Sequence, residues 1–296
     1  GVVPAIYWII QMLTEIEDSV ALMSPVYYPF ANAIRDTSRT LVDVPLVKDE
    51  NGYYTMDLES FEAMVQKKDV KLFILCSPHN PVGRVWREEE LRDLLDVCRR
   101  NGVYVIADEI HHDLIMPGHR QITAATAGDY DSILITLTSA SKTFNLASCQ
   151  NAMAIIPNDA LRAKYDAMTR RIKTQSGSSF GYVAYEAAFR GGKEWLEQAI
   201  RLIYGNYQIL VKGLKQKLPE AVVSPLEGTY LAWVDLSAYL SERDTERTIR
   251  DVCNLAVDFG EWFGRNKYEN FIRVNLATSP DNVRQIVARL DRINTL

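Results

Sequence analysis

The sequence predicts an α/β protein with a large domain built on a mostly parallel sheet flanked by helices, followed by a smaller α+β domain. Along residues 72–156, short apolar runs alternate with a helical pattern or long crossovers, which is typical of parallel sheets. The apolar fraction of 47% and the charged fraction of 24% are those of an ordinary globular chain. Because the residue pattern changes after Gly191-Gly192, we expect domains over 1–192 and 193–296.

The first part of the chain is expected to contain short alternating elements. In chain order we predict a helix over 4–16, a strand over 19–23, a helix over 27–35, an extended segment over 40–47 and a helix from Asp57 to about Gln66. Asp57 is expected to cap its helix, because an aspartate before an apolar run accepts hydrogen bonds from free backbone N–H groups.

The middle of the chain carries the clearest pattern. Its apolar runs predict buried strands over 72–76, 103–107, 133–137 and 152–156. Between the first two, residues 88–100 place Leu91, Leu94, Leu95 and Cys98 at the i, i+3, i+4 and i+7 positions of a helix. Asn101-Gly102 is expected to end that helix.

The C-terminal domain is expected to begin with a long connecting helix. We predict this helix over 194–217, strands over 230–234 and 271–276, a helix over Thr245–Phe259 and a last helix from Pro280. Strands and helices in this mixed order suit a small α+β domain.

Composition limits the classes of function and location. The net charge is −5 with both signs interspersed, so no basic track for nucleic acid is expected. The longest N-terminal apolar run, Val2–Ile10, contains Pro4 and is too short to span a bilayer. The four cysteines form no C-x-x-C pair, which favours reduced thiols in a cytoplasmic protein. The chain begins at Gly1, directly in an apolar segment, and we expect that N-terminal sequence is missing.

Polar signatures follow three of the predicted strands. They are the segments 77–83, 108–113 and 139–142, which contain Asn80, Asp108 and Lys142 respectively. In open parallel sheets, ligands bind beyond the carboxyl ends of the strands. The three segments are therefore expected to converge on one crevice, although each alone is also compatible with a turn, a helix cap or a surface cation.

Three other classes of site use residues of these kinds. The string from Val105 to His111 resembles a helicase Walker B box, but the phosphate-binding G-x-x-x-x-G-K-[ST] loop is absent. His111 and His112 are adjacent and point in different directions, so no metal site is expected. Ser139-x-x-Lys142 matches the nucleophile motif of penicillin-binding proteins, but the Lys-Thr-Gly element of that class is absent.

A lysine, a strand-end aspartate and an asparagine around one crevice suit an aromatic aldehyde cofactor. Lys142 would form a Schiff base with the aldehyde, while Asp108 would pair with a pyridinium nitrogen. Asn80 would donate to the phenolate oxygen. The phosphate would be held by two serines and by backbone N–H groups at a helix start, namely Ser139, Ser141, Val2 and Val3.

With these motifs, the sequence resembles the fold-type-I pyridoxal-phosphate (PLP) enzymes of the aspartate aminotransferase superfamily over essentially the whole chain. Asn80-Pro81-x-Gly83, Asp108-x-x-His111 and Ser139-x-Ser141-Lys142 follow that family's order and approximate spacing. The longer strings Ser77–Trp86 and Asp108–Asp113 resemble its cystathionine β-lyase-like carbon–sulfur lyases.

The resemblance implies roles for individual residues. Lys142 would be the Schiff-base lysine and the acid/base group, Asp108 the pyridinium partner and Asn80 the contact to the cofactor's O3′. Tyr27 would stack on the ring, and His111 stands where many relatives carry a tyrosine beside O3′. Arg273 would bind the substrate α-carboxylate through two hydrogen bonds. Many aminotransferases carry a phosphate-binding arginine where this sequence has Gln150.

The expected function is therefore a PLP-dependent β carbon–sulfur lyase that releases pyruvate, ammonia and a thiol from cystathionine or related cysteines. A PLP-dependent aminotransferase is the first alternative, since the two reactions share their steps up to the carbanion. A non-enzymatic alternative is the effector-sensing domain of a transcription regulator. The resemblance also implies a homodimer, because sites of this superfamily lie at a subunit interface.

Overall fold

The computed structural model describes residues 1–174, 177–240, 245–264 and 267–295. Its larger sheet has six strands in the order β2-β1-β5-β6-β7-β8. Five of them are parallel, and β8 is antiparallel to β7. The fold is thus α/β with a mostly parallel sheet, as predicted. The strands are β1 (Ser19–Leu22), β2 (Thr40–Asp43), β5 (Val70–Cys76), β6 (Tyr104–Asp108), β7 (Leu134–Thr138) and β8 (Met153–Ile155).

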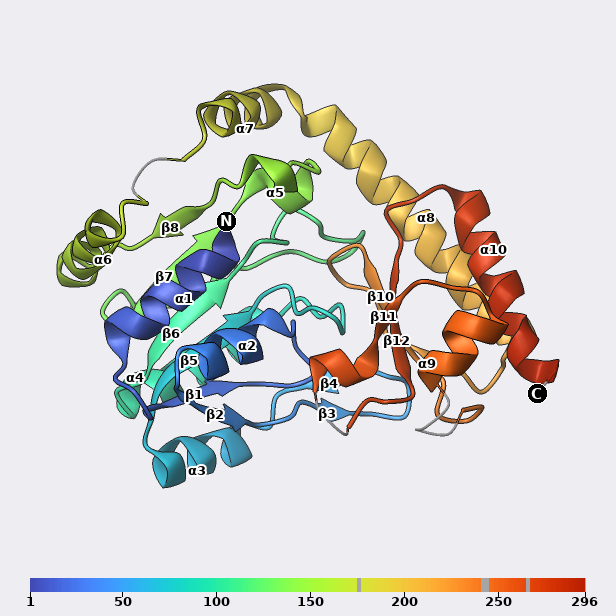
Figure 1. The fold of residues 1–296 in the computed structure, drawn as a ribbon, viewed down its shortest axis with the longest axis horizontal. Helices are drawn as coiled ribbons and strands as arrows, with labels where there is room; N and C mark the ends of the chain where they lie inside the picture. The colour runs from blue at the N-terminus through green and yellow to red at the C-terminus, as the bar shows by residue number, and fades with distance from the viewer. Residues whose placement is uncertain (175–176, 241–244, 265–266, 296) are drawn as a thin grey trace.

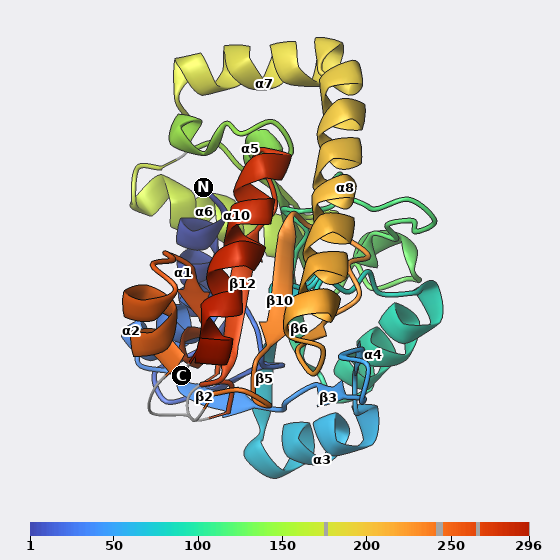
Figure 2. The same ribbon diagram turned by 90° about the vertical axis from the view of Figure 1, so that its right-hand side faces the viewer.

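Helices cover both faces of this sheet (Figures 1 and 2). One face packs against α1 (Val2–Leu13), α2 (Pro29–Asp36) and α6 (Asp159–Arg171), and the other against α3 (Leu58–Lys68) and α4 (Glu88–Arg100). Along β5, successive side chains alternate between the two apolar cores, because strand side chains point to opposite faces. A strand buried on both faces is apolar throughout, which explains the continuous apolar run in its sequence.

The C-terminal part is built on an antiparallel sheet of four strands in the order β11-β12-β10-β9. These strands are β9 (Val222–Val223), β10 (Leu231–Asp235), β11 (Asp258–Phe259) and β12 (Phe271–Asn275). The long helix α8 (Lys193–Lys217) runs from α7 (Ser179–Gly191) down to this sheet, where α10 (Pro280–Leu290) lies beside it (Figure 1). The remaining short elements are β3 (Val47–Lys48), β4 (Tyr54–Thr55), α5 (Ala140–Thr143) and α9 (Thr245–Arg247).

A separate apolar core lies between α8, the small sheet and α10. It contains Leu210, Val234, Ile272 and Val287, and a loop of the larger part adds Leu114 to it. The division into domains at residues 192 and 193 stays a prediction, and this core supports it.

The predicted helix over Thr245–Phe259 is wrong. Helical structure covers only α9 and a π-type turn over Thr248–Val252, while residues 258–259 form β11. Asn254 adopts a left-handed backbone conformation with φ of 51°, which an α-helix cannot continue through. The apolar run that follows pairs with β12 instead, so Asp258 lies opposite Arg273.

Other differences from the sequence prediction are smaller. Helix α1 covers Val2–Leu13 rather than 4–16, and Thr14 ends it by donating its hydroxyl to the carbonyl oxygen of Ile10. Helices α6 and α7 were not predicted. Both have short apolar stripes, and α7 leaves Phe180 and Val183 exposed, so their sequences lack the pattern of a helix buried on one face.

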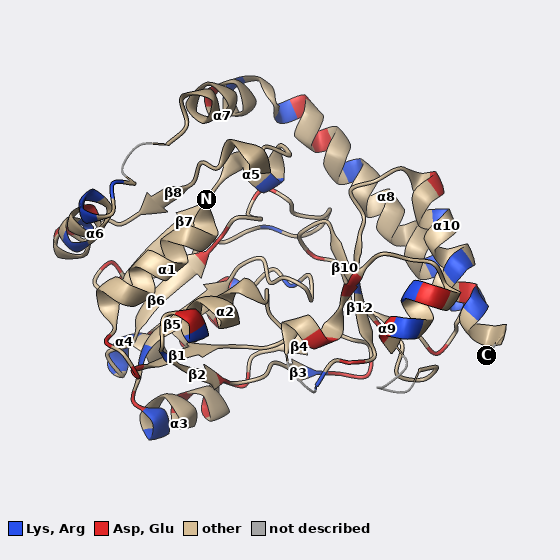
Figure 3. Ribbon diagram, in the orientation of Figure 1, with Lys and Arg blue, Asp and Glu red and all other residues tan. Residues whose placement is uncertain are grey.

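The surface carries both charges in mixture. Basic and acidic residues are interspersed along the outer helices α6, α8 and α10 (Figure 3). None of the described helices combines the length and apolar character needed to cross a membrane. Within the described ranges, no group of three His, Cys, Asp or Glu side chains is arranged to hold a metal ion.

A buried arginine connects the two parts of the molecule. Arg84 is 1% exposed, and its Nε donates to Glu227 Oε2 at 2.9 Å while its Nη2 donates to Glu90 Oε2 at 2.8 Å. It also donates to the carbonyl oxygen of Tyr54. Glu227 belongs to the segment before β10, whereas Arg84 follows β5.

Replacing Arg84 by alanine is expected to lower the free energy of unfolding by about 3–5 kcal/mol, because it leaves the buried carboxylate of Glu227 without its arginine partner. Urea denaturation measures this loss. Arg87→Ala is the matched control, since Arg87 is exposed yet pairs with the same Glu90 at 3.4 Å; its loss should stay below about 1 kcal/mol. Equal losses for the two variants would contradict a special contribution from Arg84.

Candidate active site

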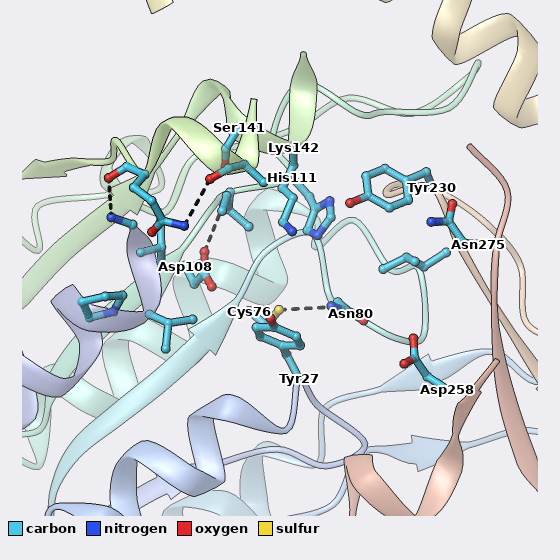
Figure 4. Close-up of a pocket in the computed structure, with 18 of the residues that line it drawn as sticks. Tyr27, Cys76, Asn80, Asp108, His111, Ser141, Lys142, Tyr230, Asp258 and Asn275 are labelled. Atoms are coloured by element: carbon cyan, nitrogen blue, oxygen red, sulfur yellow. Dashed lines mark hydrogen bonds between the residues drawn. The ribbon is translucent and has the colours of Figure 1, made fainter. Parts of the chain in front are cut away.

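A cavity of about 380 Å³ opens at the edge of the large sheet where β5, β6 and β7 end (Figure 4). The carboxyl ends of these parallel strands meet there, as predicted. The start of α1 and residues from β10 to β12 complete the wall. Every predicted site residue except Ser139 lines the cavity: Val2, Val3, Tyr27, Asn80, Asp108, His111, Ser141, Lys142 and Arg273.

Lys142 reaches the cavity from the short helix α5. Ser139 caps this helix, because its Oγ accepts a hydrogen bond from the backbone N–H of Ser141 at 3.1 Å. Burial lowers the pKa of Lys142, the charge of Arg273 lowers it further, and Asp108 opposes the shift. A larger share of the amine is therefore uncharged near neutral pH, which is the form that attacks a carbonyl or accepts a proton.

Asp108 is the last residue of β6, and it is buried in the cavity wall. Its Oδ1 accepts a hydrogen bond from the backbone N–H of Ile110 at 3.1 Å. Burial raises the pKa of Asp108 to about 7, and the bond from Ile110 only partly offsets this. No ion pair joins Asp108 to any residue the structure describes. Such a carboxylate is suited to a cationic ligand group, which would restore its charge.

The raised pKa makes stability depend on pH. Unfolded Asp108 ionises near pH 4 and folded Asp108 near pH 7. Its carboxyl therefore does not destabilise the fold below about pH 4, and it destabilises the fold fully above about pH 7. In cofactor-free protein, Asp108→Asn should therefore raise the unfolding free energy at pH 8 by up to about 4 kcal/mol, and by less at pH 5. Denaturant melts at both values, with exposed Asp93→Asn as control, measure this. A gain in unfolding free energy that did not depend on pH would contradict the raised pKa of Asp108.

Arg273 is held by residues from both parts of the molecule. Its Nη1 donates to Asn80 Oδ1 at 2.8 Å, and its Nε donates to Asp258 Oδ2 at 3.0 Å. The Asp258 pairing follows from the strand register, because β11 places Asp258 opposite Arg273 on β12. The guanidinium also lies over the ring of Phe263 at 4.8 Å. A fixed, partly buried guanidinium at a cavity wall is suited to bind a carboxylate.

Two aromatic side chains shape the cavity near Asn80. The ring of Tyr27 contacts Phe30 edge-on at 5.8 Å between centroids, and Figure 4 shows it below Cys76 and Asn80. His111 is buried, and burial lowers the pKa of its imidazole to about 3, so it is neutral. Its Nδ1 has no hydrogen-bond partner within the described ranges.

The start of α1 forms the other end of the cavity. Val2 and Val3 line it beside Ser141, so free N–H groups of the first helical turn face the same space as a hydroxyl. The backbone nitrogen of Gly1 donates to the carbonyl oxygen of Gln150 at 2.9 Å, which fixes the start of α1 beside the cavity. These groups are suited to an anion such as a phosphate.

Ser139 does not reach this anion end, contrary to the sequence prediction. Its Oγ donates to the carbonyl oxygen of Asn151 at 2.8 Å and bonds to the Tyr185 hydroxyl. The buried hydroxyl of Ser139 is thus occupied by the cap of α5 and by the loop at Asn151. Ser139 therefore shapes the helix that carries Lys142.

Several residues of the lining were not predicted from the sequence. Tyr230 and Asn275 come from the ends of the small sheet, and Cys76 lies at the end of β5. Asp258 was hidden inside the wrongly predicted helix. The sequence did offer a signal for Tyr230, because this aromatic residue begins a predicted strand directly after Gly228-Thr229.

The cavity residues fit PLP. Asp108 offers a carboxylate for a pyridinium, Lys142 an amine for an aldehyde, and the α1 start an anion site. Two buried polar atoms of the lining, His111 Nδ1 and Asn151 Nδ2, have no partner among the residues that the structure describes. Unpaired buried polar atoms are rare in folded proteins, and a polar ligand would satisfy them.

Comparison with known proteins decides the family. The model of the family "Aminotransferase class I and II" matches residues 1–290. The chain is 36% identical to cystathionine beta-lyase PatB of Bacillus subtilis, over 98% of this chain and 76% of that protein. The chain belongs to the class I and II aminotransferase family.

Solved structures of relatives agree with this membership. A PLP-bound putative aminotransferase from Clostridium difficile is 37% identical, with a TM-score of 0.95 over 99% of this chain and 76% of that one. A PLP-bound C-S lyase from Staphylococcus hominis is 31% identical, with a TM-score of 0.92 over 99% of this chain and 74% of that one. This class I and II aminotransferase family member is thus an enzyme with PLP as its cofactor, and the alternative of a regulatory sensing domain finds no support among these relatives.

Proposed function

We propose that this enzyme is a β carbon–sulfur lyase that acts on cystathionine, cysteine or related S-substituted cysteines. The observation that carries the proposal is the similarity to cystathionine beta-lyase PatB over nearly the whole chain. The residues of the cavity are consistent with it, because they provide an amine, a carboxylate-binding arginine and a buried aspartate around one space.

Each of these residues has a separate task in the proposed reaction. When bound, PLP supplies an aldehyde that condenses with amines and a ring that accepts electrons released at Cα. Arg273 would bind the substrate α-carboxylate and orient Cα. Lys142, whose pKa is lowered by burial and by Arg273, would accept the Cα proton. Asp108 would keep the ring nitrogen protonated, and Asn80 would contact the ring oxygen while it holds Arg273.

Aminotransfer is the second candidate. The family description favours it, and so does the naming of the Clostridium difficile relative as an aminotransferase. The same residues serve both reactions as far as removal of the Cα proton. The reactions differ afterwards: a lyase expels the sulfur group from Cβ, whereas an aminotransferase returns a proton to the cofactor carbon and needs a keto acid to complete its cycle.

Thiol release tests the proposed reaction. Cofactor-loaded enzyme incubated with L-cystathionine should liberate one free thiol for each substrate consumed, as measured with a thiol-reactive dye. Boiled enzyme and S-free L-alanine are the controls. Consumption of cystathionine without any thiol would exclude cleavage of the carbon–sulfur bond.

A homodimer in the cytoplasm is also proposed. The outer side of α7 and the adjacent start of α8 expose large apolar side chains, with Phe180 at 87% and Val183 at 70%, and exposed apolar patches commonly mark interfaces. All four cysteines are free, which suits a reducing compartment. Light scattering of the purified enzyme would give the oligomeric state.

A further inference from the structure

The hydroxyl of Tyr230 is free and faces the cavity. Two contacts hold this residue in place. The backbone oxygen of Tyr230 accepts a hydrogen bond from the N–H of Leu276 at 2.8 Å, and its ring packs edge-on against His111 with centroids 5.4 Å apart. Its hydroxyl has no hydrogen bond to any part of the chain that the structure describes, and it is not fully enclosed by protein atoms. Tyr230 therefore presents an unused donor to the contents of the cavity.

The position of Tyr230 separates it from the cofactor-binding groups. In Figure 4, Asp108 and Ser141 lie on one side of Lys142, while Tyr230, Asn275 and Asp258 lie on the other. The first side holds the groups assigned to the pyridine ring and phosphate. The second contains the partner of Arg273, so the substrate carboxylate would lie there.

The substituents of the substrate's Cα limit what Tyr230 can contact. The amino group is directed to the cofactor, the Cα proton to Lys142 and the carboxylate to Arg273. The side chain takes the remaining direction, and its sulfur lies only two bonds from Cα. Two described lining residues on this side carry donors without a hydrogen bond, the Tyr230 hydroxyl and the amide of exposed Asn275. Of the two, Tyr230 is the one packed against the buried His111 ring, so its donor is the fixed one.

We infer that the Tyr230 hydroxyl donates a hydrogen bond to the substrate sulfur as it leaves, an inference that rests on the proposed lyase function. When the Cβ–S bond breaks, its electron pair stays on sulfur, and the new Cα–Cβ double bond uses the electrons released at Cα. The tyrosine proton stays on its oxygen, and the thiolate later takes a proton from water. The O–H···S contact is already present with bound substrate and strengthens further as negative charge develops on sulfur, so it lowers the barrier.

The state of the phenol is consistent with a donor. Burial raises the pKa of Tyr230, and the nearby charge of Arg273 only partly opposes this. The hydroxyl therefore stays protonated at neutral pH. It is too weak an acid to give its proton to an alkanethiolate, so it acts as a hydrogen-bond donor.

Leaving-group dependence in cofactor-loaded enzyme tests this role. Tyr230→Phe keeps the ring and removes only the donor. For S-alkyl cysteines, whose thiolates are strongly basic, kcat/KM for pyruvate release should fall roughly 10- to 100-fold, the range for a hydrogen bond to a charged group. For β-chloroalanine, which expels chloride, it should fall less than about 3-fold. Tyr204→Phe is the control, since Tyr204 stacks on Tyr207 outside the cavity. An equal change for both substrates would overturn the inference.

A binding measurement separates failure of this inference from failure of the proposed function. Calorimetry of the holoenzyme should show that Tyr230→Phe weakens binding of 3-mercaptopropionate about 5-fold or more and leaves binding of propionate unchanged. If wild-type enzyme releases no pyruvate, the lyase function fails, and this comparison still decides whether Tyr230 contacts sulfur. If wild type releases pyruvate but both ligands bind the variant equally well, only the inference fails.

Discussion

Replacing Lys142 by alanine is expected to lower kcat by about 10⁴-fold or more and to abolish the visible absorption band of the bound cofactor. The variant loses both the amine that condenses with the aldehyde and the base that accepts the Cα proton, and positioned acid–base groups alone contribute up to about 10⁴-fold. Lys142 lies in the cavity on α5, so its loss removes no core packing. Stopped-flow turnover and absorbance spectra measure the two effects.

Two controls define the meaning of that result. Lys164 is exposed on α6, so Lys164→Ala should keep wild-type spectra and turnover. Circular dichroism should show an unchanged fold for both variants. A Lys142→Ala enzyme that retained the visible band would disprove the assignment of this lysine.

Asp108→Ala should reduce turnover by roughly 10²–10³-fold, the cost of removing one preorganised electrostatic contact in an active site. Without the carboxylate, the ring nitrogen loses the partner that keeps it protonated, and electrons released at Cα are poorly accommodated. The variant should fold at least as well as wild type in the absence of cofactor, because the buried carboxyl costs stability at neutral pH.

Turnover and stability should change in opposite directions in Asp108→Ala, which separates a catalytic role of Asp108 from a structural one. A residue that only supports the fold would lose stability and turnover together. Asp108→Ala should instead combine lower turnover with equal or higher stability of the cofactor-free protein. Near-normal turnover would reject its role as the partner of the ring nitrogen.

The sequence predicted the part of the site that depends on parallel strands. Asn80, Asp108 and Lys142 each follow an apolar run, and the parallel pairing of β5, β6 and β7 brings those ends together. Strand order was not needed for this prediction, because all parallel strands end at the same edge of their sheet.

Side-chain direction and the small sheet were harder to predict. Ser139 has the residue type of an anion ligand, but its hydroxyl is used by Asn151 and by the cap of α5. Asp258 reaches the site only because Asn254 ends a helical turn and β11 pairs with β12. Such contacts depend on tertiary pairing, which local sequence patterns do not encode.

Pyruvate formation without any added keto acid is the most direct test of the proposed lyase function. Cofactor-loaded enzyme supplied with L-cystathionine as its only substrate should release pyruvate continuously over many turnovers, followed with lactate dehydrogenase and NADH. For a lyase, adding 2-oxoglutarate should leave this rate unchanged. Turnover that stops after one equivalent per site and resumes only when a keto acid is supplied would contradict the lyase function and establish an aminotransferase.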